Sequence, residues 1–336
     1  MMNSAIPRRL IIAEAGSVHD GSFGNAGALI DMAAAAGANV VKFQTHIASA
    51  ETLRDAPMPP FFRGEPRFEY FERTGFSFEQ WLRLKQHCHD HNVLFLSSPF
   101  SEQAVDLLER VGADLYKVPS GEVTNVFLLE RLAATRKPVI LSSGMSNWSE
   151  LERAVGILRA APRLVLLQCS SVYPCSPDRV GLNVLEDMRR RHGVETGLSD
   201  HTLGCAAAFA AAALGATVVE KHVTFSKLMY GSDARDSMEP QEFRTFCEGL
   251  NEVWSMLDHP VDKDDVTPYG EMKRVFEKSL VSSRALSADR ALCREDFAAK
   301  KPGDGIPIAD YRKLIGRRLV RAVPADHMFS WTDIAP

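Results

Sequence analysis

Apolar segments of strand length alternate along the chain with segments of helical periodicity. The strand-like segments are near-continuous runs of Val, Ile, Leu and Phe, a pattern typical of parallel strands covered by helices. Strands are predicted over residues 10–16, 39–45, 93–100, 115–120, 139–145, 164–170, 195–201 and 218–224. Helices are predicted over residues 23–36, 78–91, 101–111, 126–134, 149–160, 182–192, 203–214 and 240–257.

Eight strand–helix units within about 250 residues predict an α/β fold of the (β/α)8 TIM barrel type, over residues 1–258. An open, doubly wound sheet is the alternative. That fold would place a glycine-rich phosphate loop after an early strand, and no G-x-G-x-x-G sequence occurs here. The barrel is therefore the preferred interpretation.

Three segments fall outside the repeating pattern. Residues 50–76 are rich in Pro, Phe and Arg and are too long for a simple strand–helix connection, so we expect a lid or substrate loop there. Residues 259–275 are polar and charged, as in a linker. Residues 276–336 contain short β-like pieces and turns, which predicts a small second domain.

Composition narrows the classes of function. A formal net charge of −4 and a pI near 6.2 do not indicate binding to nucleic acid or to an anionic membrane. No apolar run approaches the roughly 20 residues that a membrane-spanning helix needs. The six cysteines form no C-x-x-C pair, so we expect reduced thiols in a cytoplasmic protein.

Polar residues stand at the C-terminal ends of several predicted strands. Side chains alternate along a strand, so Leu10, Ile12 and Glu14 share one face. The strand ends of a closed barrel converge on the face where barrel enzymes hold their catalytic residues. We therefore expect Glu14 to share a site with similarly placed residues of other strands, namely Lys42, Lys117, His201 and His222.

The two histidines of this set suggest a metal ion. His201 and His222 lie one strand–helix–strand step apart, which places them on neighbouring strands. Imidazole suits divalent transition metals, and two protein nitrogens leave positions open for water and substrate, as in a catalytic site. A hydrogen-bonded pair without metal is the alternative.

The lysines suggest an anionic substrate. An ammonium group inside an apolar strand is costly to bury unpaired, which favours a functional role for Lys42 and Lys117. Ser120, Ser142 and Ser199 could complete a cradle for phosphate and carboxylate groups, although each serine could equally cap local backbone.

Carboxylates near these groups are candidates for proton transfer. Glu14 and Glu122 could act as acid or base, or could pair with the lysines for structural reasons alone. Asp233 follows the last strand and could bind sugar hydroxyls or form a turn. The His-rich stretch 87–91 looks metal-binding by composition, but we expect a solvated helix face there.

Short motifs accompany the predicted strand ends and the loop after the last strand. They are IAEAGSVHDGS, VVKFQTH, FLSSPF, YKVPSGE, ILSSGM, LLQCSSVYP, GLSDHTLG, VVEKHVT and GSDARDSMEP. Together they resemble the sialic acid synthase family, which makes nine-carbon nonulosonic acids, and the resemblance runs from about residue 10 to 334.

The resemblance implies a TIM barrel, a C-terminal antifreeze-like (SAF) domain, phosphoenolpyruvate as substrate and a divalent metal, Mn2+ before Mg2+ or Co2+. It also implies a homodimer with swapped SAF domains, each closing the partner's active site.

The resemblance also implies roles for single residues. His201 and His222 should bind the metal, while Glu14, Glu122 and Asp233 should act on the sugar aldehyde, its hydroxyls and metal-bound water. The phosphoenolpyruvate site should contain Lys42, Lys117, Ser120, Ser142 and Ser199, with Ser171 and Tyr173 nearby.

The chain departs from the family pattern at three places. Val18 stands where the family usually has Asn, and Ser170-Ser171 replaces Thr-Asn or Thr-Ser. Lys301 stands where the family has an arginine that contacts the N-acetyl group of the sugar, and lysine cannot form the same planar, bidentate contact. The identity of the sugar is therefore less constrained than the reaction.

The sequence thus predicts a synthase that condenses phosphoenolpyruvate with N-acetylmannosamine or a relative. Legionaminic or pseudaminic acid synthesis from a diacetamido-trideoxy hexose is the alternative. A synthase for a phosphorylated pentose or tetrose would need a further arginine cluster, which the strand ends lack. A carbohydrate-binding or assembly barrel would not need the lysines and the histidine pair.

Overall fold

The computed structural model describes residues 6–57 and 65–336. The chain divides into two compact units, residues 1–259 and 260–336. No helix in this described part is long and apolar enough to span a bilayer.

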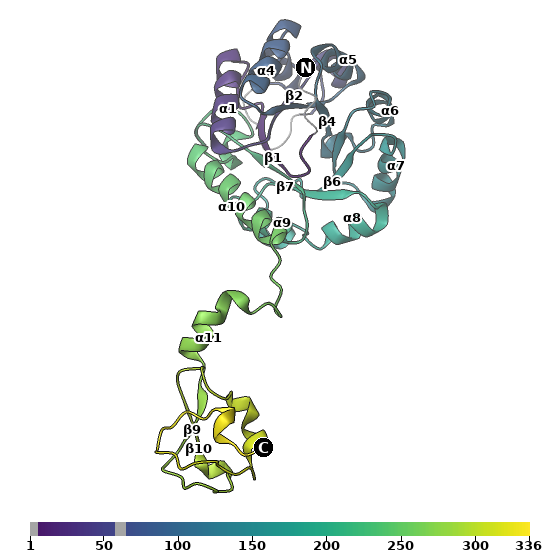
Figure 1. The fold of residues 1–336 in the computed structure, drawn as a ribbon. Helices are drawn as coiled ribbons and strands as arrows, with labels where there is room; N and C mark the ends of the chain where they lie inside the picture. Colours follow the sequence, from purple (N-terminus) through teal and green to yellow (C-terminus); the bar gives the residue numbers. More distant parts are fainter. Residues whose placement is uncertain (1–5, 58–64) are drawn as a thin grey trace. The chain divides into compact units, whose positions relative to one another are not determined.

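The first unit is a closed barrel of eight parallel strands, with helices arranged around them (Figure 1). The strands pair in chain order, and β8 pairs with β1 to close the ring. This confirms the predicted TIM barrel and excludes the open sheet. The strands are β1 (Leu10–Gly16), β2 (Val40–Thr45), β3 (Leu94–Pro99), β4 (Leu115–Val118), β5 (Val139–Ser142), β6 (Leu164–Cys169), β7 (Glu195–Asp200) and β8 (Val218–His222).

The surrounding helices begin and end close to their predicted bounds because the chain supplies capping residues there. Side chains of Ser22, Ser77 and Ser101 accept hydrogen bonds at helix N-termini, and Gly37 adopts the left-handed conformation after α1. The helices are α1 (Phe23–Ala36), α4 (Phe78–Asp90), α5 (Glu102–Val111), α6 (Val126–Ala134), α7 (Trp148–Leu158), α8 (Val184–His192), α9 (Ala206–Ala213) and α10 (Pro240–Asp258).

Alternation along the strands produces two apolar layers. Leu10 and Ile12 of β1 pack inside the barrel, whereas Ile11 and Ala13 pack between strands and helices. The next inward position on β1 is Glu14, at the C-terminal end of the strand. The alternation of side chains along a strand therefore places apolar residues inside the barrel and polar residues at its C-terminal end.

The structure differs from the predicted loop and linker. Within residues 50–76, predicted as a lid or substrate loop, residues Arg67–Thr74 form α3, and the short α2 (Ala48–Glu51) overlaps the start of the segment. Residues 58–64 of that prediction lie outside the described residues. The segment predicted as a linker contains α11 (Gly270–Phe276) in its second half.

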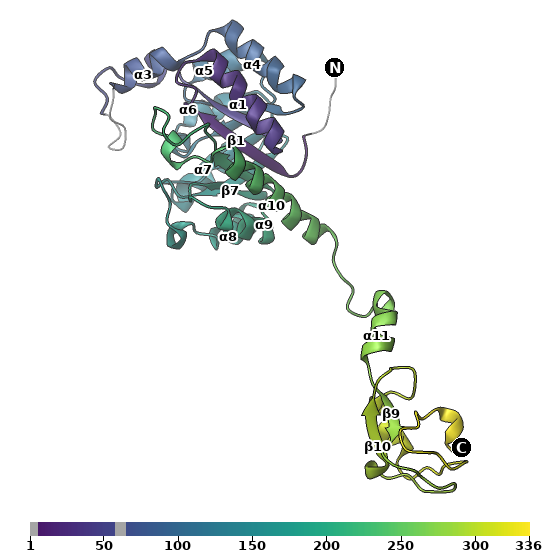
Figure 2. The same ribbon diagram turned by 90° about the vertical axis from the view of Figure 1, so that its left-hand side faces the viewer.

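The second unit has an antiparallel pair, β9 (Ser279–Ser282) and β10 (Phe297–Lys300), and the short α12 (Tyr311–Leu314) (Figure 2). Its core includes Phe297 and Phe329. Its assignment as a SAF domain stays a prediction.

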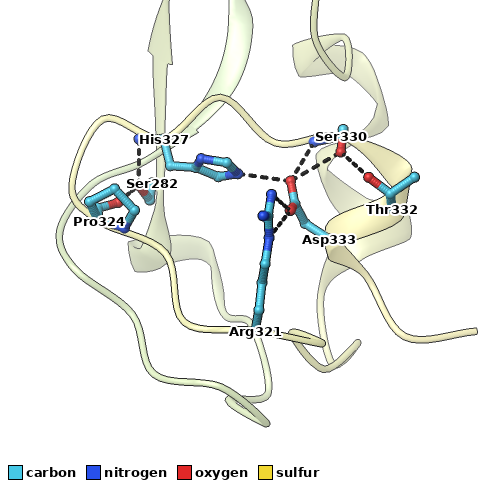
Figure 3. Close-up of polar contacts among 7 residues, drawn as sticks. All are labelled: Ser282, Arg321, Pro324, His327, Ser330, Thr332 and Asp333. Atoms are coloured by element: carbon cyan, nitrogen blue, oxygen red, sulfur yellow. Dashed lines mark hydrogen bonds and ion pairs between the residues drawn. The ribbon is translucent and has the colours of Figure 1, made fainter.

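A buried carboxylate ties together the C-terminal turns of this unit (Figure 3). Asp333 is 1% exposed and accepts hydrogen bonds from Arg321 at 2.8 Å, from His327 Nε2 at 2.8 Å and from the backbone N–H of Ser330 at 3.0 Å. Burial raises the pKa of Asp333, but these hydrogen bonds outweigh it and bring the pKa down to about 2. A depressed carboxyl pKa stabilises the fold above the unfolded pKa of about 4, and this contribution is lost as pH falls toward 2.

We expect Asp333→Asn to destabilise the second unit by roughly 1–3 kcal/mol, because Arg321 and His327 lose their charged partner. It should also remove part of the stability loss between pH 4 and 2. Hydrogen exchange at β9 and β10 in the full chain measures both effects. Asp326→Asn is the matched control, because that carboxylate is exposed and pairs only with Lys300 among the described residues. Equal exchange in both variants would contradict the prediction.

Candidate active site

A cavity of about 630 Å³ lies at the C-terminal ends of the barrel strands. Every strand contributes at least one polar side chain to its lining. From β1 to β8 these side chains include Glu14, Lys42, Gln44, Ser98, Lys117, Ser142, Cys169, Ser199, Glu220 and His222.

Most of the predicted site residues line this cavity. Two do not. The carboxylate of Glu122 accepts a hydrogen bond from Asn125 at 2.7 Å, and the residue is absent from the lining among the described residues. Lys301 belongs to the second unit, where its ammonium lies 4.8 Å from the centre of the Phe276 ring. The predicted residues that line the cavity are Glu14, Lys42, Lys117, Ser120, Ser142, Ser171, Tyr173, Ser199, His201, His222 and Asp233.

Two buried lysines share one carboxylate at the base of the site. Glu220 Oε1 lies 3.1 Å from Lys42 Nζ and 3.4 Å from Lys117 Nζ, and it accepts a hydrogen bond from Ser199 Oγ at 2.9 Å. Burial raises the pKa of Glu220, but Lys117 and Lys42 outweigh it, so the carboxyl is ionised. Burial lowers the pKa of Lys117, and Lys42 lowers it further. Two ammonium groups with one carboxylate between them leave a positive charge that suits an anion.

Glu14 lies beside this group, but its pKa lies much closer to neutral than that of Glu220. Its Oε1 accepts a hydrogen bond from Gln44 at 2.8 Å, and its Oε2 lies 3.4 Å from Lys42 Nζ. Burial raises the pKa of Glu14 to about 7, and the charge of Glu220 adds to this while Lys42 opposes it. Near neutral pH, Glu14 can therefore hold or release a proton.

The two histidines are neighbours, with ring centres 5.6 Å apart. The Nδ1–H of His201 donates to the Ser170 carbonyl oxygen at 2.9 Å, which leaves the lone pair on Nε2. His222 Nδ1 is buried without a hydrogen-bond partner among the described residues. Burial lowers the pKa of His222 to about 4, so its ring is neutral. The neutral His222 ring can thus offer a nitrogen lone pair. His201 Nε2 offers another when its ring is neutral; burial lowers the pKa of His201, but Cys169 and the Ser170 carbonyl raise it overall.

Cys169 contacts the same region. Its Sγ lies 3.9 Å from His201 Nδ1 and 3.4 Å from Ser120 Oγ. Burial raises the pKa of this thiol, but His201, Ser120 and Lys117 outweigh it and bring the pKa to about 7. Sequence analysis had not placed Cys169 among the site residues.

Hydroxyl groups gather on the side of the cavity formed by β4, β5 and β6. A Cβ at Gly144 would lie 2.2 Å from Ser171 Oγ and 2.6 Å from Ser120 Oγ, so only glycine fits between these hydroxyls. Ser142 Oγ and Ser98 Oγ are buried without hydrogen-bond partners in the described part of the chain. Unpaired buried hydroxyls beside two lysines indicate a place for a polar, anionic ligand.

Asp233 approaches the end of β1 from the loop after β8. A Cβ at Gly16, whose φ is +51°, would lie 2.6 Å from Asp233 Oδ2, so the glycine is required for this contact. Ser232 Oγ donates to Asp233 Oδ1 at 2.9 Å. The predicted loop carboxylate therefore reaches the cavity, next to Glu14.

Asp200 precedes His201 in the chain but points to the other side of β7. Its carboxylate lies on the outer face of the barrel strand and accepts a hydrogen bond from Lys221 at 2.8 Å. Glu220, by contrast, faces inward and joins the lysines. Residues 220 and 222 share a face by alternation, so the pattern that identified His222 also contained the signal for Glu220. Gln44 was likewise missed as a site residue.

This fold and site define a barrel of the enzyme type, with a pocket at the strand ends that holds two buried lysines. A sequence profile of the NeuB family matches residues 29–262. The chain is also similar over nearly its whole length to proteins of known type. N,N'-diacetyllegionaminic acid synthase of Campylobacter jejuni is 32% identical over 330 residues, which are 96% of this chain and 98% of the relative. The chain belongs to the NeuB family and is an enzyme.

Two further similarities show how the family divides. Pseudaminic acid synthase of Helicobacter pylori is 29% identical over 332 residues, covering 96% of this chain and 97% of the relative. The crystal structure of an N-acetylneuraminic acid synthetase from Leptospira borgpetersenii, in complex with citrate, is 30% identical with a TM-score of 0.69. That similarity covers 79% of this chain and 90% of the other. The names of these proteins differ in the sugar acid they make.

Proposed function

We propose that this enzyme condenses phosphoenolpyruvate with the open-chain aldehyde of a 2-acetamido sugar, giving a nonulosonic acid and phosphate. The observation that supports this most is the pair of buried lysines, Lys42 and Lys117, which face unpaired hydroxyls in the cavity. A phosphate and a carboxylate on one small molecule would match that arrangement. Membership of the NeuB family supports the same reaction.

The residues of this chain would act as follows. The methylene carbon of phosphoenolpyruvate forms a bond to the aldehyde carbon, and the aldehyde oxygen takes a proton from Glu14. Water then adds to the enol carbon and gives one proton back to Glu14. The bond from that carbon to the phosphate oxygen breaks, the remaining hydroxyl proton leaves with the phosphate, and a ketone forms. Lys42 and Lys117 stabilise the departing phosphate, while the barrel interior excludes bulk water from below.

We further propose that His201 and His222 hold a divalent cation, Mn2+ first. The fit rests on two imidazole lone pairs and on the buried, unpartnered Nδ1 of His222. No third His, Cys or carboxylate atom in the described residues joins both rings within 4.8 Å, so substrate or water would supply the other ligands. A bound cation would withdraw electron density from the aldehyde oxygen.

We propose N-acetylmannosamine as the acceptor, and the diacetamido-trideoxy hexoses of legionaminic and pseudaminic acid synthesis as the alternative. The names of the relatives divide between the two. A phosphate-release assay with phosphoenolpyruvate, Mn2+ and each sugar in turn compares them by kcat/KM. The proposal would be overturned if the enzyme released phosphate with a phosphorylated pentose or tetrose but with none of these sugars.

The resemblance of the second unit to a SAF domain leads us to propose a homodimer with swapped second units. Sedimentation of the full chain tests the dimer. A monomer at micromolar concentration would contradict it.

Glu14 should impose a pH dependence on the reaction. Its protonated form is the active one in our proposal and its pKa is about 7, so kcat/KM should fall as pH rises through 7. Glu14→Gln should be slower by about 10²–10⁴-fold and should lack this inflection. Gln44→Leu is the companion variant. Losing the Gln44 hydrogen bond, which lowers the pKa of Glu14, should move the inflection to higher pH. An unchanged profile in Glu14→Gln would assign the proton to another group.

A further inference from the structure

A second group of metal-ligand atoms lies outside the barrel mouth, between α1 and α4. Ligand atoms of Asp31, His87 and His91 all lie within 4.8 Å of one another, and no other trio of this kind occurs in the described part of the chain. Asp31 is on α1, His87 is in the last turn of α4, and His91 is the residue that ends α4. The two helices are neighbours in Figures 1 and 2.

The helix geometry explains why the two imidazoles meet. Residues four apart on a helix point to the same side, and the ring centres of His87 and His91 are 4.5 Å apart. His87 Nε2 lies 2.6 Å from Asp31 Oδ1, and His91 Nε2 lies 3.2 Å from the same oxygen. Both rings therefore direct the same kind of nitrogen at one carboxylate oxygen.

Both nitrogens of the His91 ring face acceptor atoms. Its Nδ1 lies 3.0 Å from the carbonyl oxygen of His87, and a carbonyl only accepts, so Nδ1 carries the hydrogen. Its Nε2 lies 3.2 Å from Asp31 Oδ1, so a positive charge, either a proton on Nε2 or a metal ion, must lie between these two atoms. The backbone contact at Nδ1 is also the kind that orients metal-binding histidines.

The distances suit a small metal ion after a modest adjustment. With bonds of 2.0–2.1 Å in tetrahedral geometry, two ligand atoms lie about 3.3 Å apart. The separation of His91 and Asp31 already matches this value, and that of His87 and Asp31 must widen by about 0.7 Å. The three side chains are partly exposed, so they can make this movement. Three protein ligands would leave a fourth position for water.

We propose that Asp31, His87 and His91 form a second divalent-cation site that links α1 to α4. Two imidazoles and one carboxylate favour Zn2+ and similar transition metals over Mg2+ or Ca2+. This site is separate from the barrel mouth and does not depend on the proposed reaction. The sequence predicted a solvated helix face at residues 87–91, and His87 and His91 are indeed partly exposed. That prediction did not include Asp31, because Asp31 comes from another helix.

The test is the number of Zn2+ ions bound by the full chain, measured by titration calorimetry after removal of metal with a chelator. His87→Ala/His91→Ala should bind one Zn2+ fewer than the wild type. His89→Ala is the matched control, because His89 belongs to the same helix but pairs with Asp114 at 2.9 Å, and it should bind as many as the wild type. Equal binding by the double variant and the wild type would overturn the proposal, whether or not the barrel mouth takes up Zn2+.

Hydrogen exchange locates the bound ion, and an activity assay checks that the variant is folded. Zn2+ should slow hydrogen exchange at the C-terminal end of α4 in the wild type and in His89→Ala, but not in Asp31→Asn, which keeps both imidazoles. Phosphate release by His87→Ala/His91→Ala should equal that of the wild type, showing that the variant is folded. If Zn2+ slowed exchange in Asp31→Asn as strongly as in the wild type, the Asp31 carboxylate would not be a ligand of the ion.

Discussion

Replacing His222 with alanine is expected to reduce phosphate release from phosphoenolpyruvate by about a thousandfold or more, even with excess Mn2+. The physical reason is the loss of one of two neighbouring nitrogen donors at the end of β8. His201 would then lose its neighbouring imidazole, and no third His, Cys or carboxylate atom in the described residues lies within 4.8 Å of both rings. Steady-state release of phosphate with the preferred sugar measures the effect.

The matched control is His192→Ala. His192 is also a buried histidine with an unpartnered ring nitrogen among the described residues, but it ends α8 and does not line the cavity. Its loss should lower stability while leaving kcat/KM near the wild-type value. Wild-type turnover in His222→Ala would remove the metal site from the mechanism. A large loss in both variants would instead indicate damage to the fold.

Replacing Glu220 with glutamine is expected to lower kcat/KM for phosphoenolpyruvate by about 10²–10³-fold and to destabilise the barrel by roughly 3–5 kcal/mol. Glu220 is the carboxylate that separates Lys42 from Lys117. Without its charge, two buried ammonium groups face each other, and the pKa of Lys117, already lowered by burial, should fall further. A deprotonated lysine binds phosphate poorly.

The pH dependence distinguishes this cause from a general loss of structure. Lowering the pH returns the proton to Lys117, so KM for phosphoenolpyruvate in Glu220→Gln should improve toward acid pH. Ser199→Ala is the comparison that preserves charge, because it removes a hydroxyl of the cavity and its 2.9 Å hydrogen bond to Glu220 but leaves every charge in place. It should lose much less activity and show no such rescue. A Glu220→Gln profile parallel to that of the wild type would mean that this carboxylate does not maintain the lysines' charge.

The barrel was predictable because its signals are local. Each strand is a short apolar run, and helices such as α4 begin at a capping side chain that the sequence displays. The histidine pair and the two lysines followed from the same alternation, since a polar residue after inward-facing apolar residues must emerge at the strand end. The second half of the predicted linker differed, because α11 is only seven residues long, too short for its periodicity to separate a helix from a loop.

What the sequence determined by itself was the type of residue at each strand end and the family those residues resemble. What only the tertiary structure decided was which of them meet. Glu220 and Lys221 are adjacent in sequence, yet one joins the lysines inside the barrel and the other pairs with Asp200 outside it. Asp31 likewise reaches His87 and His91 only because two helices pack together. Pairing between distant residues depends on the closing of the barrel, which places side chains from separate segments within a few ångströms.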